Sequence, residues 1–366
     1  MDVRGPGVDL PLTEQYVHGA VELETTARGV LPHRLPAWAR RQFPDPQLLT
    51  AEAQPSGVRV VFRGTVSAVE LRVEATRQSY PGVPPRPPGV YDLRVDGELV
   101  GLTTADEGRV VFTGVPARDQ LVEVWLPQHE RTELLSCRVE GSARPVVDER
   151  PVWVHHGSSL SQGSGAASPS TTWVALAAPH LQLRNLGLGG GALLDASTAR
   201  AVRDLPADVV SLELGINVVN ADAMRLRAFT PAVHGFLDTV REGHPATPLL
   251  VVTPLHCALH EDTPGPGAFD LDALARGEVR FTATGTPEPG RLTLSSLRAE
   301  LERVVRQRQA DDPHLHLVDG LELFGAADEA AHPLPDALHL DAVSHRLVAE
   351  RFAPHLRRAL PGPPGR

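Results

Sequence analysis

Residues 149–163 read ERPVWVHHGSSLSQG, and this stretch decides the fold. Val152–Val154 is a short apolar run, which predicts a buried strand. It leads directly into His155-His156-Gly157-Ser158-Ser159-Leu160-Ser161, a polar turn that contains a glycine and three serines. A buried strand that ends in such a turn is typical of the first strand of an α/β unit.

The chain after residue 150 continues this pattern, with apolar runs alternating with helical stretches. Helices are expected to begin at Thr230-Pro231, after Thr293 and after Asp341, because a capping residue or a proline marks each start. Strands alternating with helices predict a parallel sheet covered on both faces. The stretch from His260 to Arg291 is rich in Gly and Pro and predicts a long loop over the sheet. The further expected strands are Leu181–Leu183, Val209–Leu214, Leu249–Val252 and Leu315–Val318.

The chain before residue 150 has a different pattern. Its short apolar runs are separated by Gly, Pro and Asp, helical periodicity is largely absent, and Asp96-Gly97 between apolar residues predicts a hairpin. We therefore expect an all-β sandwich of the jelly-roll kind over residues 1–150, followed by an α/β domain over 151–366. The expected strands are Val58–Phe62, Val69–Val73, Val90–Val95, Val110–Phe112 and Leu121–Leu126.

Ligands of open parallel sheets lie outside the carboxyl ends of the strands. Four clusters follow expected strands or come late in the chain, and we expect them to meet at one edge: His155–Ser161, Asn185–Gly191, Gly215–Asn217 and Asp336–His339.

These clusters hold the residue types that acyl transfer requires. A serine hydroxyl is a weak nucleophile until a base removes its proton, and His339 can be that base for Ser159. Asp336, three residues earlier, can hold the imidazole in the correct tautomer. The negative oxygen of the tetrahedral intermediate needs donors already aimed at it. We expect these to be the backbone N–H groups of Ser159 and Gly190 and the side-chain amide of Asn217.

The four clusters resemble the blocks of the SGNH/GDSL serine hydrolases, in the same order: GSSLS, NLGLGG, GIN and DALH. The resemblance covers roughly residues 151–360 and implies a three-layer α/β/α, flavodoxin-like domain with a Ser159–His339–Asp336 triad. A preceding β-sandwich resembles two-domain members, including carbohydrate esterases and acyltransferases of natural-product pathways. Two positions depart from the family pattern: Ser158 and Val218 stand where Asp is common.

Each cluster also has an ordinary structural interpretation. Ser158, Ser159 and Ser161 can simply cap a helix, and Asn217 can be a turn residue. We expect His155 and His156 to serve packing or hydrogen bonding, and Cys257 to be a small buried apolar residue.

Two cofactor alternatives compete with the triad. Gly187–Ala192 fits the glycine pattern of dinucleotide sites, with Glu213 placed to hold a ribose, but it leaves the other clusters unexplained. The histidines His256, His260, His314 and His316 raise a metal alternative without any established ligand spacing. We predict no cofactor and no metal.

The composition limits which classes of binding partner are expected. The net charge is −10 and no basic block is present, which argues against nucleic acid or an anionic membrane as a partner. The two cysteines, Cys137 and Cys257, form no disulfide framework. Without a secretory signal or membrane segment, we expect a cytoplasmic protein; its oligomeric state is open.

The sequence therefore predicts an esterase that acts on a small-molecule ester through an acyl-serine intermediate. The alternative is an O-acyltransferase whose acceptor is a sugar or metabolite alcohol. A third class, a non-catalytic binding protein, fits poorly because the set of catalytic residue types is complete.

Overall fold

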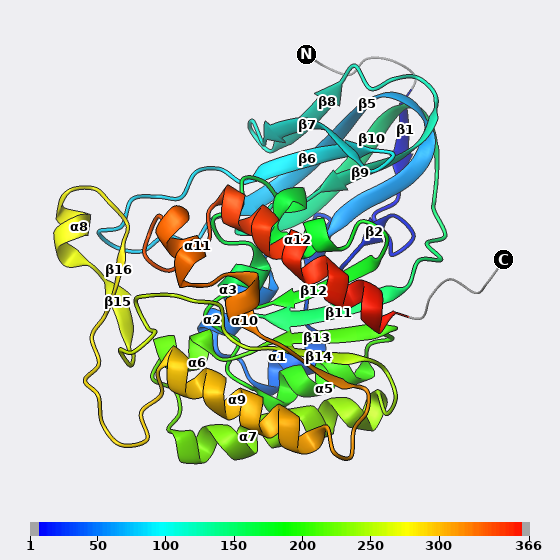
Figure 1. Ribbon diagram of the computed structural model, residues 1–366. Helices are drawn as coiled ribbons and strands as arrows, with labels where there is room; N and C mark the ends of the chain where they lie inside the picture. Colours follow the sequence, from blue (N-terminus) through cyan, green and yellow to red (C-terminus); the bar gives the residue numbers. More distant parts are fainter. Residues whose placement is uncertain (1–6, 361–366) are drawn as a thin grey trace.

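The computed structural model describes residues 7–360 and contains two large sheets, each with its own apolar core, and a small two-stranded one (Figure 1). A ten-stranded antiparallel sheet precedes a five-stranded parallel one along the chain. The antiparallel sheet stands above the parallel one in Figure 1, as expected for a β-sandwich before an α/β domain. No helix among the described residues is long and apolar enough to cross a bilayer.

The antiparallel sheet is built around β5, an 18-residue strand whose two edges pair with β10 on one side and with β9 and β8 on the other. Its inward side chains form one core that includes Phe62, Tyr91 and Leu134. The strands are β1 (Gly7–Leu10), β2 (Val17–His18), β3 (Glu22–Thr25), β4 (Val30–His33), β5 (Arg59–Thr76), β6 (Val90–Val95), β7 (Glu98–Thr104), β8 (Arg109–Thr113), β9 (Asp119–Trp125) and β10 (Arg131–Arg144).

The expectations for this half were largely confirmed. The hairpin at Asp96-Gly97 is present, with φ of 48° and 87° at the two turn residues, which is the left-handed geometry that short hairpins need. The separation of Val58–Phe62 from Val69–Val73 was wrong, because the single strand β5 contains the second run and all of the first except Val58. The short helices α1 (Ala37–Gln42) and α2 (Pro46–Glu52) were not expected.

The parallel sheet has the order β12-β11-β13-β14-β17, with every neighbouring pair parallel. All five expected strands are present, within a few residues of the predicted bounds. The chain moves to one side of β11 and then to the other, so the switch point of the sheet lies at the carboxyl ends of β11 and β13. The strands are β11 (Val152–Gly157), β12 (Gln182–Gly187), β13 (Val209–Glu213), β14 (Leu249–Val252) and β17 (Leu315–Val318).

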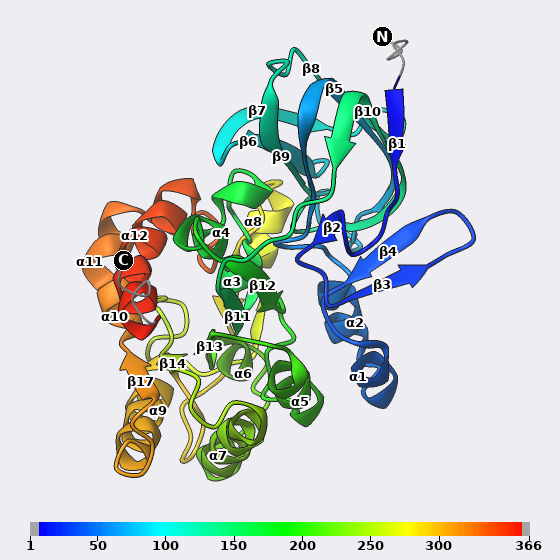
Figure 2. The same cartoon turned by 90° about the vertical axis from the view of Figure 1, so that its right-hand side faces the viewer.

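Helices cover both faces of this sheet (Figures 1 and 2). The rings of Trp153 and Phe352 stack 5.7 Å apart on the face of α4 and α12, whereas His156 stacks on Phe236 of α7 on the other face, 5.7 Å apart. The helices are α3 (Ser159–Gln162), the 3₁₀ turn η1 (Pro169–Thr171), α4 (Trp173–Ala177), α5 (Ala196–Asp204), α6 (Ile216–Asn220), α7 (Leu226–Gly243), α8 (Leu271–Ala275), α9 (Leu294–Arg308), α10 (Gly320–Leu323), α11 (Ala326–Ala331) and α12 (Ala342–Ala359).

Two of the three predicted helix starts were confirmed. Thr293 caps α9 through the amide of Ser296, and Asp341 caps α12 through that of Ser344. The start at Thr230-Pro231 was wrong, because α7 begins at Leu226 and contains Pro231. Pro231 is the sixth residue of α7, beyond the first four N–H groups, so the helix lacks the hydrogen bond that this position would donate to the carbonyl of Arg227.

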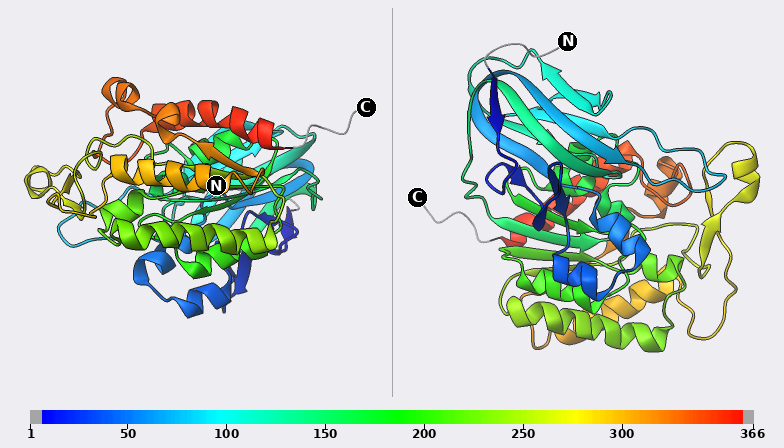
Figure 3. Two further views of the ribbon diagram at one scale, coloured as in Figure 1. Left: turned by 60° about the horizontal axis from the view of Figure 1, so that its bottom comes forward. Right: turned by 180° about the vertical axis from the view of Figure 1, so that it is seen from behind.

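The segment from His260 to Arg291 is only partly a loop. It contains the hairpin of β15 (Gly267–Phe269) and β16 (Phe281–Ala283), with α8 between the two strands. Figure 1 shows this hairpin projecting beyond the carboxyl ends of the parallel strands, and the rear view in Figure 3 shows it on the same side as the loop between β5 and β6. Segments from both halves of the chain therefore lie at this edge.

Candidate active site

The end of β11 presents Ser159 at the first position of α3. Ser158 caps this helix by accepting a hydrogen bond from the amide of Leu160. Gly157 is required at the turn, because an added Cβ would lie 2.3 Å from Ser161 Oγ and 2.8 Å from Glu213 Oε2. Ser158 therefore caps the helix, and the neighbouring Ser159 presents its hydroxyl to the pocket.

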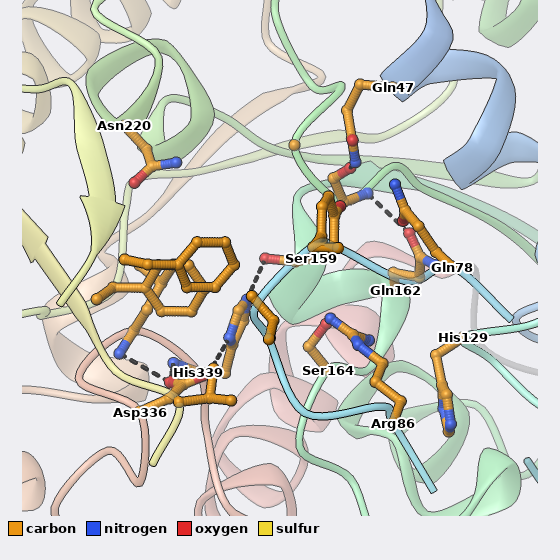
Figure 4. Close-up of a pocket in the computed structure, with 18 of the residues that line it drawn as sticks. Gln47, Gln78, Arg86, His129, Ser159, Gln162, Ser164, Asn220, Asp336 and His339 are labelled. Atoms are coloured by element: carbon orange, nitrogen blue, oxygen red, sulfur yellow. Dashed lines mark hydrogen bonds and ion pairs between the residues drawn. The ribbon is translucent and has the colours of Figure 1, made fainter. Parts of the chain in front are cut away.

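Ser159, His339 and Asp336 form a continuous hydrogen-bonded chain (Figure 4). Ser159 Oγ lies 3.0 Å from His339 Nε2, and His339 Nδ1 lies 2.7 Å from Asp336 Oδ2. A carboxylate only accepts, so Nδ1 donates to Asp336 and Nε2 is left to accept the serine proton. Residues 180 positions apart are thus in the arrangement that activates a serine hydroxyl.

The turn around Asp336 holds its carboxylate in place. Asp336 Oδ1 accepts the amides of Leu338 and His339, at 3.0 and 2.7 Å, while Oδ2 faces the imidazole. Ala337 has a φ of 69°, so the turn uses the left-handed region. Burial raises the pKa of Asp336, but the hydrogen bonds and positive charge of His339, together with the amide of Leu338, hold the pKa below its ordinary value.

Three donors are grouped beside Ser159. Within residues 7–360, the N–H groups of Ser159 and Gly190 and the amide nitrogen of Asn217 make no hydrogen bond. Asn217 Oδ1 accepts the amide of Ala192 at 3.2 Å, which fixes which end of this side chain is a donor. Ser159, Gly190 and Asn217 all line the same pocket. This grouping is suited to a developing oxyanion.

The first half of the chain supports the loop that carries Gly190. Gln162 Oε1 accepts the amide of Gly189 at 2.7 Å, and its Nε2 donates to Gln54 and to Gln128 O. Gln47 of α2 donates to Gly189 O at 2.7 Å. The backbone of Gly189 is therefore held at its N–H by Gln162, whose side chain reaches the sandwich, and at its carbonyl oxygen by Gln47 of α2.

Beneath the same loop lies the buried guanidinium of Arg34. It donates to the carbonyl oxygens of Asn185, Gly187 and Ala51. Burial lowers the pKa of Arg34 to about 9, against the opposing charge of Glu52. A buried arginine that bonds three carbonyls ties the segment that carries α1 and α2 to β12, at the edge of the parallel sheet.

The pocket in front of Ser159 has a volume of about 420 Å³ and walls of two kinds. One wall is aromatic: Phe281 meets the ring of His339 edge-on at 5.7 Å and stacks on Phe269 at 5.1 Å. Tyr80, from the loop between β5 and β6, extends this wall at 6.0 Å from Phe269. The remaining lining is largely polar, with amide side chains from Gln47, Gln54, Gln78, Gln162, Asn217 and Asn220.

The competing interpretations find little support in this geometry. Glu213 is buried and accepts the amide of Ser158, so it is not placed to reach a ribose. Among the described residues, no group of three or more His, Cys, Asp or Glu is arranged around a common metal position. Cys257 is buried, and burial together with the charge of Glu329 raises its pKa to about 12.

Several pocket residues were not expected from the sequence. Phe269 and Phe281 lie in a non-periodic segment, and Gln47 and Gln54 lie in a part of the chain predicted to be all β. Only Gln162 had a usable signal, since it follows the GSSLS block directly.

Comparisons with known proteins agree with this fold. A family model described as the N-terminal domain of SsfX3 matches residues 15–134. The whole chain is similar to the salicylyl-acyltransferase SsfX3 from a tetracycline biosynthetic pathway, with 28% identity, 98% of each chain covered and a TM-score of 0.82. A comparison with proteins of curated function found no match.

More distant structures share the fold. A protein from Bacteroides ovatus described as a GDSL-like lipase has 18% identity over 96% of this chain and 98% of its own, with a TM-score of 0.71. A family two carbohydrate esterase from Cellvibrio japonicus has 12% identity over 96% and 98%, with a TM-score of 0.59.

The chain, with a β-sandwich before its α/β domain, is similar in fold to serine hydrolases and acyltransferases of the SGNH/GDSL type with two domains. Among these proteins, it is similar over nearly its whole length to the salicylyl-acyltransferase SsfX3.

Proposed function

We propose that the chain transfers acyl groups through an ester on Ser159 Oγ. The observation that supports this proposal is the hydrogen-bonded chain Ser159–His339–Asp336 at the wall of an open pocket. His339 Nε2 takes the proton of Ser159 as its oxygen attacks the substrate carbonyl. His339 then gives this proton to the leaving group, and Asp336 stabilises the imidazolium in between.

The proposed oxyanion hole consists of the N–H groups of Ser159 and Gly190 and the amide of Asn217. Hydrogen bonds to a negative oxygen are strongest in a site that excludes water and whose donors are already oriented. The anchored carbonyl end of Asn217 and the doubly held backbone of Gly189 supply this orientation.

We favour an alcohol over water as the second acceptor, which makes the chain an O-acyltransferase. The likeness to a salicylyl-acyltransferase at 28% identity supports this choice. The pocket supports it as well, because residues from both halves of the chain enclose it and leave room for an acceptor beside the acyl-enzyme. Hydrolysis by water is the alternative and uses the same residues; the carbohydrate esterases share the fold alone.

The aromatic wall beside His339 suits an acyl or alcohol group with a flat ring, since such rings gain from stacked and edge-on contacts. The substrate is therefore proposed to be a small-molecule ester. A cytoplasmic location and the boundary between domains 1–150 and 151–366 remain predictions from the sequence.

The test has two parts. A fluorophosphonate should form one adduct with the protein and none with Ser159→Ala, and labelling of Ser159→Ala would move the nucleophile elsewhere. Product partitioning should then use one activated salicylyl or benzoyl ester with rising concentrations of sugars and phenols. A saturable rise in acylated alcohol, with free acid falling in step, is expected of a transferase; free acid alone across the panel is expected of an esterase.

A further inference from the structure

A second chain of polar side chains lies beneath Ser159, and the proposed acyl transfer uses none of it. Its members come from β11, α3 and β13, and each is at most 1% exposed. They are Trp153, His155, Ser161, Ser211 and Glu213. Because a substrate has no access to it, this serine–histidine–carboxylate set is not a second active site.

The hydrogen bonds of this buried set run without a break from the indole of Trp153 to the carboxylate of Glu213. Trp153 Nε1 lies 2.8 Å from Ser211 Oγ, which lies 2.7 Å from His155 Nδ1. His155 Nε2 lies 2.7 Å from Ser161 Oγ, which lies 3.1 Å from Glu213 Oε2. Glu213 Oε2 also accepts the amide of Ser158 at 2.8 Å.

Every hydrogen bond in this chain has a fixed direction. Glu213 Oε2 accepts the proton of Ser161, so Ser161 can only accept from His155 Nε2. The neutral ring then accepts the proton of Ser211 at Nδ1, and Ser211 accepts from the indole N–H of Trp153. Burial lowers the pKa of His155 well below its ordinary value, which agrees with a neutral ring in this role.

The chain ends at the residue before the nucleophile. By accepting the amide of Ser158, Glu213 fixes the start of the turn whose next peptide carries the N–H of Ser159. The direction of that N–H and the position of Ser159 Oγ both depend on this turn. Ser158 has no carboxylate of its own, and Glu213 brings one to the turn from the neighbouring strand.

We propose that Glu213 is a positioning residue that aims the hydroxyl and the backbone N–H of Ser159, with the chain from Trp153 to Ser161 holding it from behind. This inference rests on the proposed function, because Glu213 orients the Ser159 hydroxyl, which the proposed function makes the nucleophile. For this role, Glu213 needs only a hydrogen-bond acceptor at Oε2. Burial raises the pKa of Glu213 while bonds from Ser158 and Ser161 lower it, and either protonation state keeps that acceptor.

The experiment compares Glu213→Ala, Glu213→Gln and Ser161→Ala with the unaltered chain. An activated ester gives kcat and KM, and the rate of fluorophosphonate labelling reports the nucleophile directly. Glu123→Ala is the matched control, because Glu123 is a buried carboxylate of the sandwich that pairs with Arg59 at 3.0 Å, away from Ser159. It should lower the melting temperature without lowering kcat.

Glu213→Ala is expected to lower kcat and the labelling rate by about 10- to 100-fold, with KM within about threefold, since misplacing a reacting group by 1 Å costs about 100-fold. Glu213→Gln should restore most of the loss, because its amide oxygen can accept both hydrogen bonds. Ser161→Ala, which keeps the acceptor and removes its support, should fall between them. Should Glu213→Ala fail to fold, the ranking of the other two variants carries the test.

Three results would overturn the inference: an unchanged kcat in folded Glu213→Ala, a Glu213→Gln variant as slow as Glu213→Ala, or a Ser161→Ala variant equal to the unaltered chain when Glu213→Ala cannot be obtained. Ser159→Ala, measured in parallel, separates the two proposals. Its full activity would refute the proposed function, whereas an inactive Ser159→Ala beside a fully active Glu213→Ala would refute only the role of Glu213.

Discussion

Removing the side-chain amide of Asn217 should reduce the rate of acylation and leave substrate binding nearly intact. The carbonyl end of this amide is held by the N–H of Ala192 at 3.2 Å, which directs its nitrogen, and this nitrogen makes no hydrogen bond within residues 7–360. Such a donor acts mainly when the substrate carbonyl becomes an oxyanion. Loss of one donor of this kind lowers kcat by about 10²–10³, or about 2.7–4 kcal/mol.

Two substitutions separate the donor from the space it fills. Asn217→Ala removes the donor, and kcat should fall by the full factor while KM changes less than about threefold. Asn217→Asp keeps the size but sets a negative charge beside the oxyanion. Two unit charges about 4 Å apart repel by about 4 kcal/mol at an effective dielectric constant near 20, so this variant should be slower still.

Steady-state kinetics with an activated ester give kcat and KM, and thermal melting checks that each variant is folded. Asn220→Ala is the comparison, since Asn220 lines the same pocket but pairs with His260 Nε2 at 3.0 Å. It should alter KM more than kcat. An Asn217→Ala variant with unchanged kcat, or a KM that rises as far as kcat falls, would falsify the oxyanion role.

Three further predictions concern the surroundings of the site. Gln162→Ala should lower kcat about tenfold, because the backbone of Gly189 loses one of its two supports; steady-state kinetics check this, and an unchanged kcat contradicts it. Phe281→Ala should raise KM roughly 2- to 10-fold for benzoyl esters and less for acetyl esters, since an aromatic contact contributes about 0.5–1.5 kcal/mol; equal changes for both esters would exclude ring recognition. Burial lowers the pKa of His345 to about 4, so between pH 6.5 and 4 the unfolded state binds a proton that the folded state does not. Stability should therefore fall as pH drops through this window, by up to roughly 3 kcal/mol from this group, and His345→Gln should show a shallower fall in melting temperature.

The parallel half of the chain could be predicted from sequence because local signals and topology agree there. Apolar runs of three to six residues mark the strands, and the ends of parallel strands meet at one edge. That geometry alone brought Ser159, Gly190 and Asn217 together across about 60 residues of sequence. Asp336 and His339 follow the last strand and reach the same edge.

The walls of the pocket could not be predicted in this way. Phe269 and Phe281 lie on two three-residue strands, too short to give a periodic pattern. Helices α1 and α2 have six and seven residues, and isolated helices of that length are not stable. Long-range contacts stabilise them instead, such as the packing of Leu35 and Leu48 against Leu188 in one small core.

The anchoring of Arg34 also has a consequence for synthesis of the chain. Arg34 and the carbonyl of Gly187 are 153 residues apart, so at 5–20 residues per second the arginine leaves the ribosome about 8–30 s before its last partner exists. Throughout that interval its charge stays hydrated at the surface of a half-made protein. The segment around Arg34 therefore cannot reach its final hydrogen bonding until β12 has been made, although the sandwich has an apolar core of its own.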